Sequence, residues 1–230
     1  MNNSTNPIRK LQNAEQGRTA FVLANGPSLL SEPLELLQDQ LLIGMNGSTA
    51  LEHDNGLVQN YYTVSDRRFL EHPEKGHWAT TSLNPVTRRV LRADLRDSDS
   101  PVLTENTYFV PHLKRDGFSQ DLAAGFFYGC TTTMLAIQLA AYLGCKSIFL
   151  LGVDLRYRPD QPRCYSESSP QVEDAFTSVQ IWNVANAARV LRLNGVSLSN
   201  CSEHSLLRPY LPFVPFEEAV SSGAMETATQ

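Results

Sequence analysis

Short apolar segments bounded by polar residues recur along the chain and predict β-strands. Five of them are rich in β-branched or aromatic residues and end at Gly, Asn or Asp, covering residues 19–24, 41–45, 61–65, 147–152 and 196–200. Several, such as FVLA and IFLLGV, are apolar at nearly every position, which is typical of parallel strands covered on both faces. A sixth strand is predicted at 107–112.

Longer segments between these strands predict three helices, at residues 28–38, 131–143 and 171–193. The second is apolar around almost its whole circumference and should be buried. The third follows Pro170 and stops at Asn194-Gly195, which are good start and stop signals.

This alternation of strands and helices predicts one α/β domain, Rossmann-like and doubly wound around a mostly parallel sheet. We expect the domain to span residues 18–218, with a lid or insertion at about 72–120, where helix and loop signals are mixed. The polar ends, 1–17 and 219–230, are expected to be flexible tails.

Composition narrows the class of protein. Of the 230 residues, 42% are hydrophobic and the formal net charge is −5, so a substantial core is expected and a nucleic-acid surface is not. The four cysteines are scattered, without the spacing of a zinc site or a disulfide framework. Neither a signal peptide nor a membrane span is evident, which predicts a cytoplasmic protein with at most peripheral membrane association. The sequence leaves open whether the chain forms a homo-oligomer.

Polar residues follow each predicted strand, at the sheet edge where doubly wound folds bind ligands. After the first strand, Gly26 allows a tight turn, Pro27 fixes it, and Ser28 can cap a helix whose amides face an anion. With Asn25 this turn predicts a phosphate or nucleotide loop, although an ordinary strand-to-helix turn has the same residues. It matches neither the P-loop nor the dinucleotide fingerprint.

Three further turns carry candidate ligand groups. Asn46-Gly47 follows the second strand, and the Asn amide can donate to and accept from a base or ribose. The hydroxyls of Thr131, Thr132 and Thr133 begin the buried helix and could hold an anion, or simply cap the helix. Asp154 follows an apolar strand as a candidate base or ribose ligand, with an ion pair to a nearby arginine as the alternative.

Taken in order, AFVLANGPSLL, LLIGMNGS, GCTTTMLAIQLAAYLGCKSIFLLGVDLRY and NGVSLSNCSEHSLL resemble the bacterial sialyltransferases of glycosyltransferase family 42. They also resemble the related MptE-like proteins, once called domain of unknown function 115, which include archaeal 6-hydroxymethylpterin diphosphokinases. The resemblance covers residues 19–207, with the middle poorly matched.

The resemblance implies a Rossmann-like, GT-A-like variant fold that binds CMP-sialic acid without a metal and transfers the sugar with inversion. It places the nucleotide at the strand ends and the sugar carboxylate at the threonine turn. The nucleotide-binding positions it implies are Asn25, Gly26, Pro27, Ser28, Asn46, Gly47, Ser65, Thr131, Thr132, Thr133, Gly152, Asp154 and Tyr157.

The chain departs from the sialyltransferase pattern at the general base. Those enzymes have a histidine before the long helix, whereas RPDQPRCYSESSPQ contains none, although Tyr165 can stand for one of their phosphate-binding tyrosines. Asp154, Asp66, Glu167 and His204 are candidates for the base, and histidine has the best-suited pKa. Ser65-Asp66 after the third strand is closer to the MptE-like pattern.

Four arginines, Arg88, Arg89, Arg92 and Arg96, fall close to one face if their segment is helical. A solvated face with ion pairs is the usual reason for such spacing, and the alternative is a surface for an anionic acceptor.

The leading hypothesis is a transferase that moves a sugar, most simply a CMP-linked nonulosonic acid, from a nucleotide donor to a surface glycan acceptor without a cofactor. The alternative is an MptE-like diphosphokinase with Mg²⁺-ATP, whose metal Asp66 and Asp154 would hold. A third possibility is a relative that binds the nucleotide and catalyses nothing.

Overall fold

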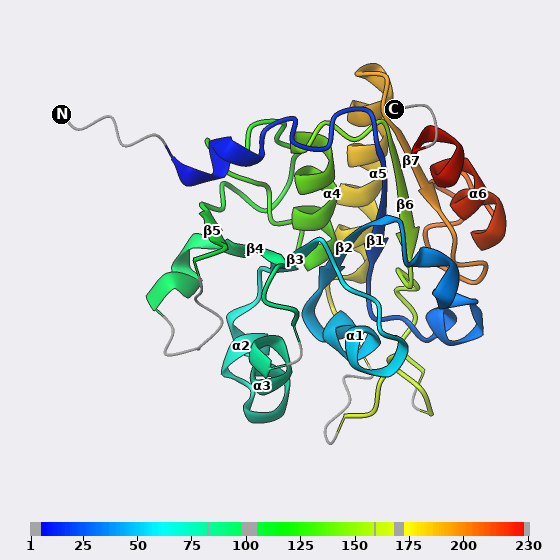
Figure 1. Ribbon diagram of the computed structural model, residues 1–230, viewed down its shortest axis with the longest axis horizontal. Helices are drawn as coiled ribbons and strands as arrows, with labels where there is room; N and C mark the ends of the chain where they lie inside the picture. The colour runs from blue at the N-terminus through cyan, green and yellow to red at the C-terminus, as the bar shows by residue number, and fades with distance from the viewer. Residues whose placement is uncertain (1–5, 82, 98–104, 159, 168–172, 228–230) are drawn as a thin grey trace.

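A computed structural model describes residues 6–81, 83–97, 105–158, 160–167 and 173–227. Seven strands form a single parallel sheet in the order β5-β4-β3-β2-β1-β6-β7 (Figure 1). The strands are β1 (Thr19–Leu23), β2 (Leu41–Met45), β3 (Tyr61–Val64), β4 (Arg88–Arg92), β5 (Thr107–Val110), β6 (Ser147–Leu151) and β7 (Ser197–Asn200). The predicted α/β, doubly wound, parallel fold is confirmed.

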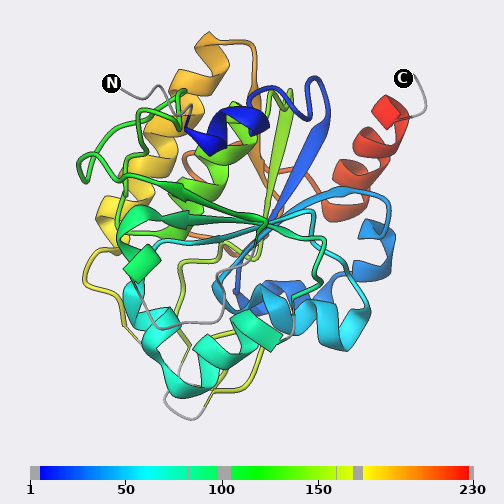
Figure 2. The same ribbon diagram turned by 60° about the vertical axis from the view of Figure 1, so that its left-hand side comes forward.

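Helices cover both faces of the sheet (Figure 2). On one face lie α4 (Thr132–Tyr142) and α5 (Thr177–Leu193). They pack on alternate side chains of the strands, such as Ala20 and Val22 of β1. The other face carries α1 (Thr49–Asn55), α2 (Arg67–Glu71), α3 (Pro73–Thr81) and α6 (Phe216–Thr227). Phe21 and Leu23 pack on that side, as the period of two in a strand requires.

The predicted buried helix is α4, which begins after its N-cap Thr131. The predicted helix at 28–38 is instead two short 3₁₀ helices, η2 (Pro27–Ser31) and η3 (Leu34–Leu37). Pro33 separates them, because proline has no amide hydrogen and its ring clashes with a preceding turn. Helix α5 begins at Thr177; residues 171–172 of the predicted helix lie outside the described residues.

The expectation of a helical arginine face was wrong. Arg88, Arg89 and Arg92 lie on β4, between β3 and β5, and Arg96 lies in the 3₁₀ helix η5 (Ala93–Asp97). Their heads are held locally: Arg92 Nε donates to Asp94 at 2.5 Å, and Arg96 lies over the Phe109 ring. Aliphatic stems let arginine occupy a strand beside buried apolar neighbours. The predicted insertion therefore supplies two strands of the sheet itself.

Neither predicted tail is loose where the structure describes it. In the 3₁₀ helix η1 (Pro7–Leu11), Ile8 and Leu11 are buried in the core. The amides of Asn13, Glu15 and Gly17 then donate to carbonyls at the end of α4 and just beyond it. At the other end, α6 buries Phe216 and Ala219. Few apolar residues suffice to anchor each end, which is why polar composition misled the prediction.

The topology creates a switch point between β1 and β6. The chain builds outward from β1 to β5, returns through α4, and continues with β6 on the other side of β1. Loops leaving the carboxyl ends of these neighbours diverge, which opens the crevice in which such folds bind ligands.

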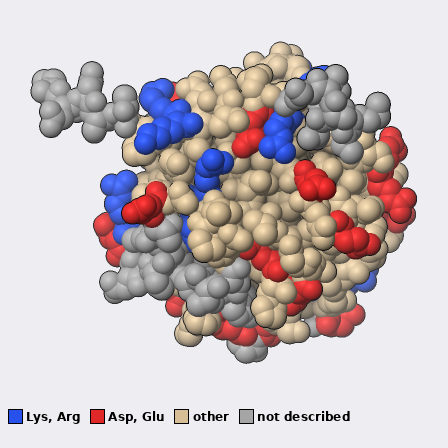
Figure 3. Space-filling view, in the orientation of Figure 1, with Lys and Arg blue, Asp and Glu red and all other residues tan. Residues whose placement is uncertain are grey.

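None of the helices within the described residues combines the length and the hydrophobicity that crossing a bilayer requires. On the face shown in Figure 3, Lys and Arg gather mainly at the upper left, and Asp and Glu lie along the right and lower edges. Charges of both signs are thus divided into small groups on that face.

Candidate functional site

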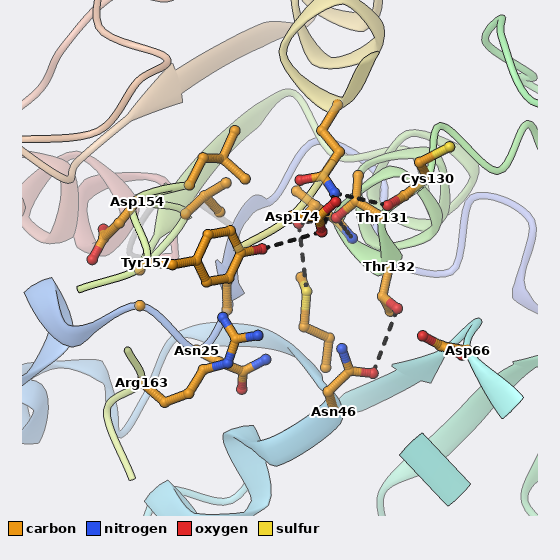
Figure 4. Close-up of a pocket in the computed structure, with 18 of the residues that line it drawn as sticks. Asn25, Asn46, Asp66, Cys130, Thr131, Thr132, Asp154, Tyr157, Arg163 and Asp174 are labelled. Atoms are coloured by element: carbon orange, nitrogen blue, oxygen red, sulfur yellow. Dashed lines mark hydrogen bonds between the residues drawn. The ribbon is translucent and has the colours of Figure 1, made fainter. Parts of the chain in front are cut away.

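A cleft lies at the switch point, where the strand-end loops meet the N-terminus of α4 (Figure 4). The empty space in it is about 810 Å³, including space open to solvent. The residues that line it are Ala24, Asn25, Gly26, Met45, Asn46, Ser65, Asp66, Arg68, Tyr128, Cys130, Thr131, Thr132, Thr133, Gly152, Val153, Asp154, Leu155, Arg156, Tyr157, Pro162, Arg163, Asp174 and Gln180.

Unusual backbone conformations gather around this cleft. Among the described residues, four that are not glycine have a positive φ, and three of these line the cleft: Asn46 at 49°, Cys130 at 58° and Leu155 at 54°. For a bulky residue such as Leu155 this left-handed conformation is a true outlier, and each such residue costs about 1 to 3 kcal/mol. Strain of this kind persists where the surroundings fix it, and it clusters at functional sites.

Asp154 joins the loop after β6 to the loop after β1. Its carboxylate, on a residue that is 8% exposed, accepts the Ser28 amide at 3.0 Å and the Ser28 hydroxyl at 2.5 Å. Gly26 lies against the same group, because a Cβ there would stand 2.5 Å from both the carboxylate and the Gly152 carbonyl oxygen. The Ser28 amide that the sequence assigned to a phosphate is therefore bonded to the protein's own carboxylate.

The N-terminus of α4 is the helix end that opens into the cleft. Thr131 caps it by accepting the Thr133 amide at 3.2 Å. The Thr132 hydroxyl bridges the next two loops, at 2.8 Å from the Ser65 hydroxyl and 3.4 Å from Asn46 Oδ1. The positive end of an 11-residue helix favours an anion at this point.

A strap comprising residues 161–167 crosses the ends of β1 and β2. The Cys164 amide donates to the Asn25 carbonyl at 2.9 Å, and the Tyr165 ring occupies the space that a Cβ on Gly47 would need. Beyond them the buried carboxylate of Glu167 forms an ion pair with Lys75 of α3. The strap is thus fixed at three points and presents Arg163 to the cleft.

Arg163 and Tyr157 form one wall of the cleft (Figure 4). The Arg163 guanidinium lies 4.9 Å from the centroid of the Tyr157 ring and 3.8 Å from Glu167. The Tyr157 hydroxyl donates to Asp174 at 3.4 Å, and Asp174 also accepts Gln180 Nε2 at 2.9 Å. Arginine in such a place binds phosphate well, because its planar donors match the phosphate oxygens.

Asn25 contributes a buried hydrogen-bond acceptor to the cleft. Its side-chain oxygen Oδ1 is shielded from solvent and accepts no hydrogen bond from the described residues. An orphaned buried acceptor costs about 1 to 3 kcal/mol, so a ligand that donated to it would recover that energy.

Burial raises the pKa of Tyr128, Cys130 and Tyr157, which all line the cleft. For Tyr157, Arg163 opposes the rise and Asp174 adds to it. The protonated forms are therefore favoured at neutral pH: the two tyrosines are hydrogen-bond donors, and Cys130 is a thiol instead of a nucleophilic thiolate.

The structure brings most of the predicted residues to the cleft but not all. Pro27, Ser28 and Gly47 lie behind its wall, and Tyr165 lines a neighbouring hollow with Glu167. His204 is exposed and outside the lining residues, and its carbonyl accepts Arg156 Nε at 2.5 Å. Their proposed roles in binding or proton transfer stay predictions.

Arg163, Asp174, Gln180 and Cys130 line the cleft without having been singled out from the sequence. Arg163 and Asp174 lie in a stretch with no regular pattern. Gln180 is 3% exposed, but no pattern distinguishes it in the sequence, because α5 carries several other polar residues.

The two carboxylates suggested for Mg²⁺ do not form a metal site as they stand. Both oxygens of Asp66 are held by Arg68, with the closest contact at 2.7 Å, and both oxygens of Asp154 are held by Ser28. Within the described residues, no group of three or more His, Cys, Asp or Glu side chains is arranged to hold a metal ion.

The family described as 6-hydroxymethylpterin diphosphokinase MptE-like matches the chain over residues 1–160. The chain belongs to the MptE-like family. The matched residues include six strands and the strand-end loops as far as Tyr157, while Arg163 lies beyond them. No curated protein matches this MptE-like chain.

Two solved structures share the fold of this MptE-like protein. The MAf glycosyltransferase from Magnetospirillum magneticum AMB-1 is 15% identical, with a TM-score of 0.60 over 96% of this chain, which spans 40% of that protein. The sialyltransferase CstII from Campylobacter jejuni, in a complex with a substrate analogue, cytidine-5'-monophosphate, is 12% identical with a TM-score of 0.54. That match covers 87% of this chain and 86% of the sialyltransferase.

Proposed function

We propose that this MptE-like protein is a glycosyltransferase that takes a sugar from a CMP-linked donor, with a nonulosonic acid as the sugar, and attaches it to a glycan. The observation that carries the proposal is the switch-point cleft, which gathers the N-terminus of α4, hydroxyls, an orphaned amide oxygen and three arginines, of which Arg163 lies on the strap. These groups suit a nucleoside monophosphate that is held without a bound metal. The likeness in fold to a sialyltransferase solved with cytidine-5'-monophosphate supports the choice of nucleotide.

In this proposal the phosphate of the donor lies between the N-terminus of α4 and Arg163. The acceptor hydroxyl oxygen bonds to the anomeric carbon, the bond from that carbon to the phosphate oxygen breaks, and CMP leaves with the bonding electrons. Arg163 and the α4 amides neutralise the charge that develops on the phosphate. Asp66 and Asp174 are the lining carboxylates not bonded to Ser28, and either could accept the proton of the hydroxyl.

A titration panel tests this proposal before any acceptor is known. Calorimetry with CMP, CDP, UDP, GDP and ATP, each with Mg²⁺ and with EDTA, should show CMP binding at micromolar to millimolar concentration, with the same affinity in EDTA. A preference for ATP that requires Mg²⁺ would favour the diphosphokinase function instead. Binding of none of the five would contradict a nucleotide site altogether.

The Arg163→Gln variant separates recognition of the phosphate from recognition of the nucleoside. We expect CMP affinity to fall by about 10- to 100-fold, the size of a lost charge-assisted hydrogen bond, while cytidine affinity stays within about threefold. Both are measured by calorimetry. Arg189→Gln is the matched control, because Arg189 is an arginine on α5 that bonds Asn186 and does not line the cleft. An equal loss for CMP and cytidine would show that Arg163 does not bind the phosphate.

The diphosphokinase function is the second candidate, and the family match favours it. It requires Mg²⁺-ATP, and the residues that would hold the metal are bonded to Arg68 and Ser28. A protein that binds CMP but neither transfers nor hydrolyses a CMP-linked sugar would be the non-catalytic relative.

A further inference from the structure

A second hollow lies directly beside the candidate nucleotide cleft. The residues that line it are Arg115, Asp116, Ser178, Val179 and Trp182. The Gly129 amide donates to the Arg115 carbonyl at 2.6 Å, and on the cleft side of the same turn Gln180 Nε2 donates to the Cys130 carbonyl at 3.0 Å. The turn at 129–130 therefore contacts residues that line both hollows.

Trp182 is the dominant apolar group of this second hollow. It is 56% exposed, although α5 buries Val184, Ala187 and Leu191 on its opposite side. Phe176, at the start of the same helix, is 51% exposed. A large aromatic ring left uncovered within a hollow is a common sign of a binding surface, because a ligand that covers the ring buries a large apolar area.

Fixed polar groups stand beside the indole. Asn183 Nδ2 donates to Asp116 Oδ1 at 2.9 Å, and Arg115 Nη2 donates to Asp116 Oδ2 at 2.8 Å. The Asn183 side chain also accepts the Gly117 amide at 3.2 Å, which anchors the segment that carries both charges. The carboxylate and the guanidinium are thus held in place, and each keeps lone pairs or protons for a further partner.

The flat apolar indole of Trp182, with the ion-paired Asp116 carboxylate and Arg115 guanidinium beside it, suits the chemistry of a pyranose ring. One face of such a ring presents C–H groups that pack on an aromatic surface, and its hydroxyls both donate and accept hydrogen bonds. A stable contact between two protein copies needs about 800 Å² of surface on each, more than one indole among charged residues supplies. We propose that this second hollow binds a pyranose ring of the carbohydrate acceptor, packed on Trp182 and hydrogen-bonded to Asp116.

This inference rests on the proposed glycosyl transfer, because an acceptor must reach the donor. Across the single turn at 129–130, a glycan whose ring lies on Trp182 can extend a hydroxyl toward the cleft that Cys130 and Gln180 line. Both residues of that turn, Gly129 and Cys130, have φ near 58°, so two successive residues in the left-handed backbone conformation define its shape.

The test uses the fluorescence of Trp182 in the full chain. The protein has two tryptophans, so Trp78→Phe leaves Trp182 as the only indole. Methyl β-D-galactopyranoside, methyl α-D-glucopyranoside and N-acetylglucosamine are titrated with and without CMP. We expect at least one to shift the emission saturably at millimolar concentration, and Asp116→Ala to weaken that binding about tenfold. No shift with any of the three would overturn the inference.

Saturation-transfer NMR with the same three sugars extends the test to variants that lack the indole. The transfer should disappear in Trp182→Ala and persist in Trp182→Phe and in Leu193→Ala, the matched control at an exposed apolar residue on the far end of α5. Transfer that persists in Trp182→Ala, or a wild-type dimer in sedimentation velocity that Trp182→Ala dissociates, would overturn the inference. The CMP titration in the same samples reports separately on the proposed function.

Discussion

Gly26→Ala is expected to abolish CMP binding and to lower the free energy of unfolding by about 1 to 3 kcal/mol, the usual range for an overpacked buried site. The added methyl group would lie 2.5 Å from the Gly152 carbonyl oxygen and from the Asp154 carboxyl group. One of those neighbours is backbone, and the Gly26 amide already donates to it at 2.8 Å. The two loops that leave β1 and β6 must therefore move apart, and both line the cleft.

Calorimetry with CMP and thermal unfolding measure the two effects of Gly26→Ala. Gly56→Ala is the matched control, since a Cβ there meets no atom within 4 Å and the substitution bears only the strain of a φ of 66°. We expect Gly56→Ala to cost about 1 kcal/mol of stability and to leave CMP affinity unchanged. If Gly26→Ala bound CMP like the wild type, the loop after β1 would not be the nucleotide loop.

Asp154→Ala is expected to destabilise the protein by about 2 to 4 kcal/mol, which corresponds to a fall in Tm of about 5 to 15 °C for a chain of this size. The reason is that the substitution leaves the Ser28 amide without its acceptor in a place that water does not reach easily. A catalytic base behaves differently, because its removal lowers the rate and leaves stability nearly unchanged. Thermal unfolding thus distinguishes the two roles predicted for Asp154.

Ser28→Ala completes a double-mutant cycle with Asp154→Ala. If the two side chains act through their shared bond at 2.5 Å, the loss of stability in the double variant will be smaller than the sum of the single losses. Wild-type stability in Asp154→Ala, together with a large loss of CMP affinity, would instead show that the carboxylate faces the ligand.

The fold was largely predictable from the sequence because its strands are apolar on both faces. Five strand predictions within 19–200 correspond to β1, β2, β3, β6 and β7, and the turn residues bounding them located the ligand edge of the sheet. β4 escaped notice because RRVLR has charged ends, and arginine stems that pack along a strand have no periodic signature. The ends of the chain were misjudged because isolated residues such as Ile8 and Ala219 anchor them.

The candidate site was predictable only in part. Turn residues that follow strands, such as Asn46 and Thr132, could be located because strand ends meet at one edge of a parallel sheet. The pairing of Asp154 with Ser28 joins residues 126 positions apart, and no local pattern reports it. Likewise, Arg163 reaches the cleft through an irregular strap whose course depends on contacts with Asn25, Gly47 and Lys75.

The strand order also has a consequence for how the chain is made. β2 follows β1 closely along the chain, but the other edge of β1 pairs with β6, which ends at Leu151. At a synthesis rate of about 5 to 20 residues per second, the apolar TAFVL edge therefore stays without its partner for roughly 6 to 26 s. During that interval the emerging polypeptide presents an open β-edge of the kind that aggregates, and of the strand pairs in the sheet only that of β6 with β7 needs residues made later than those of the switch point.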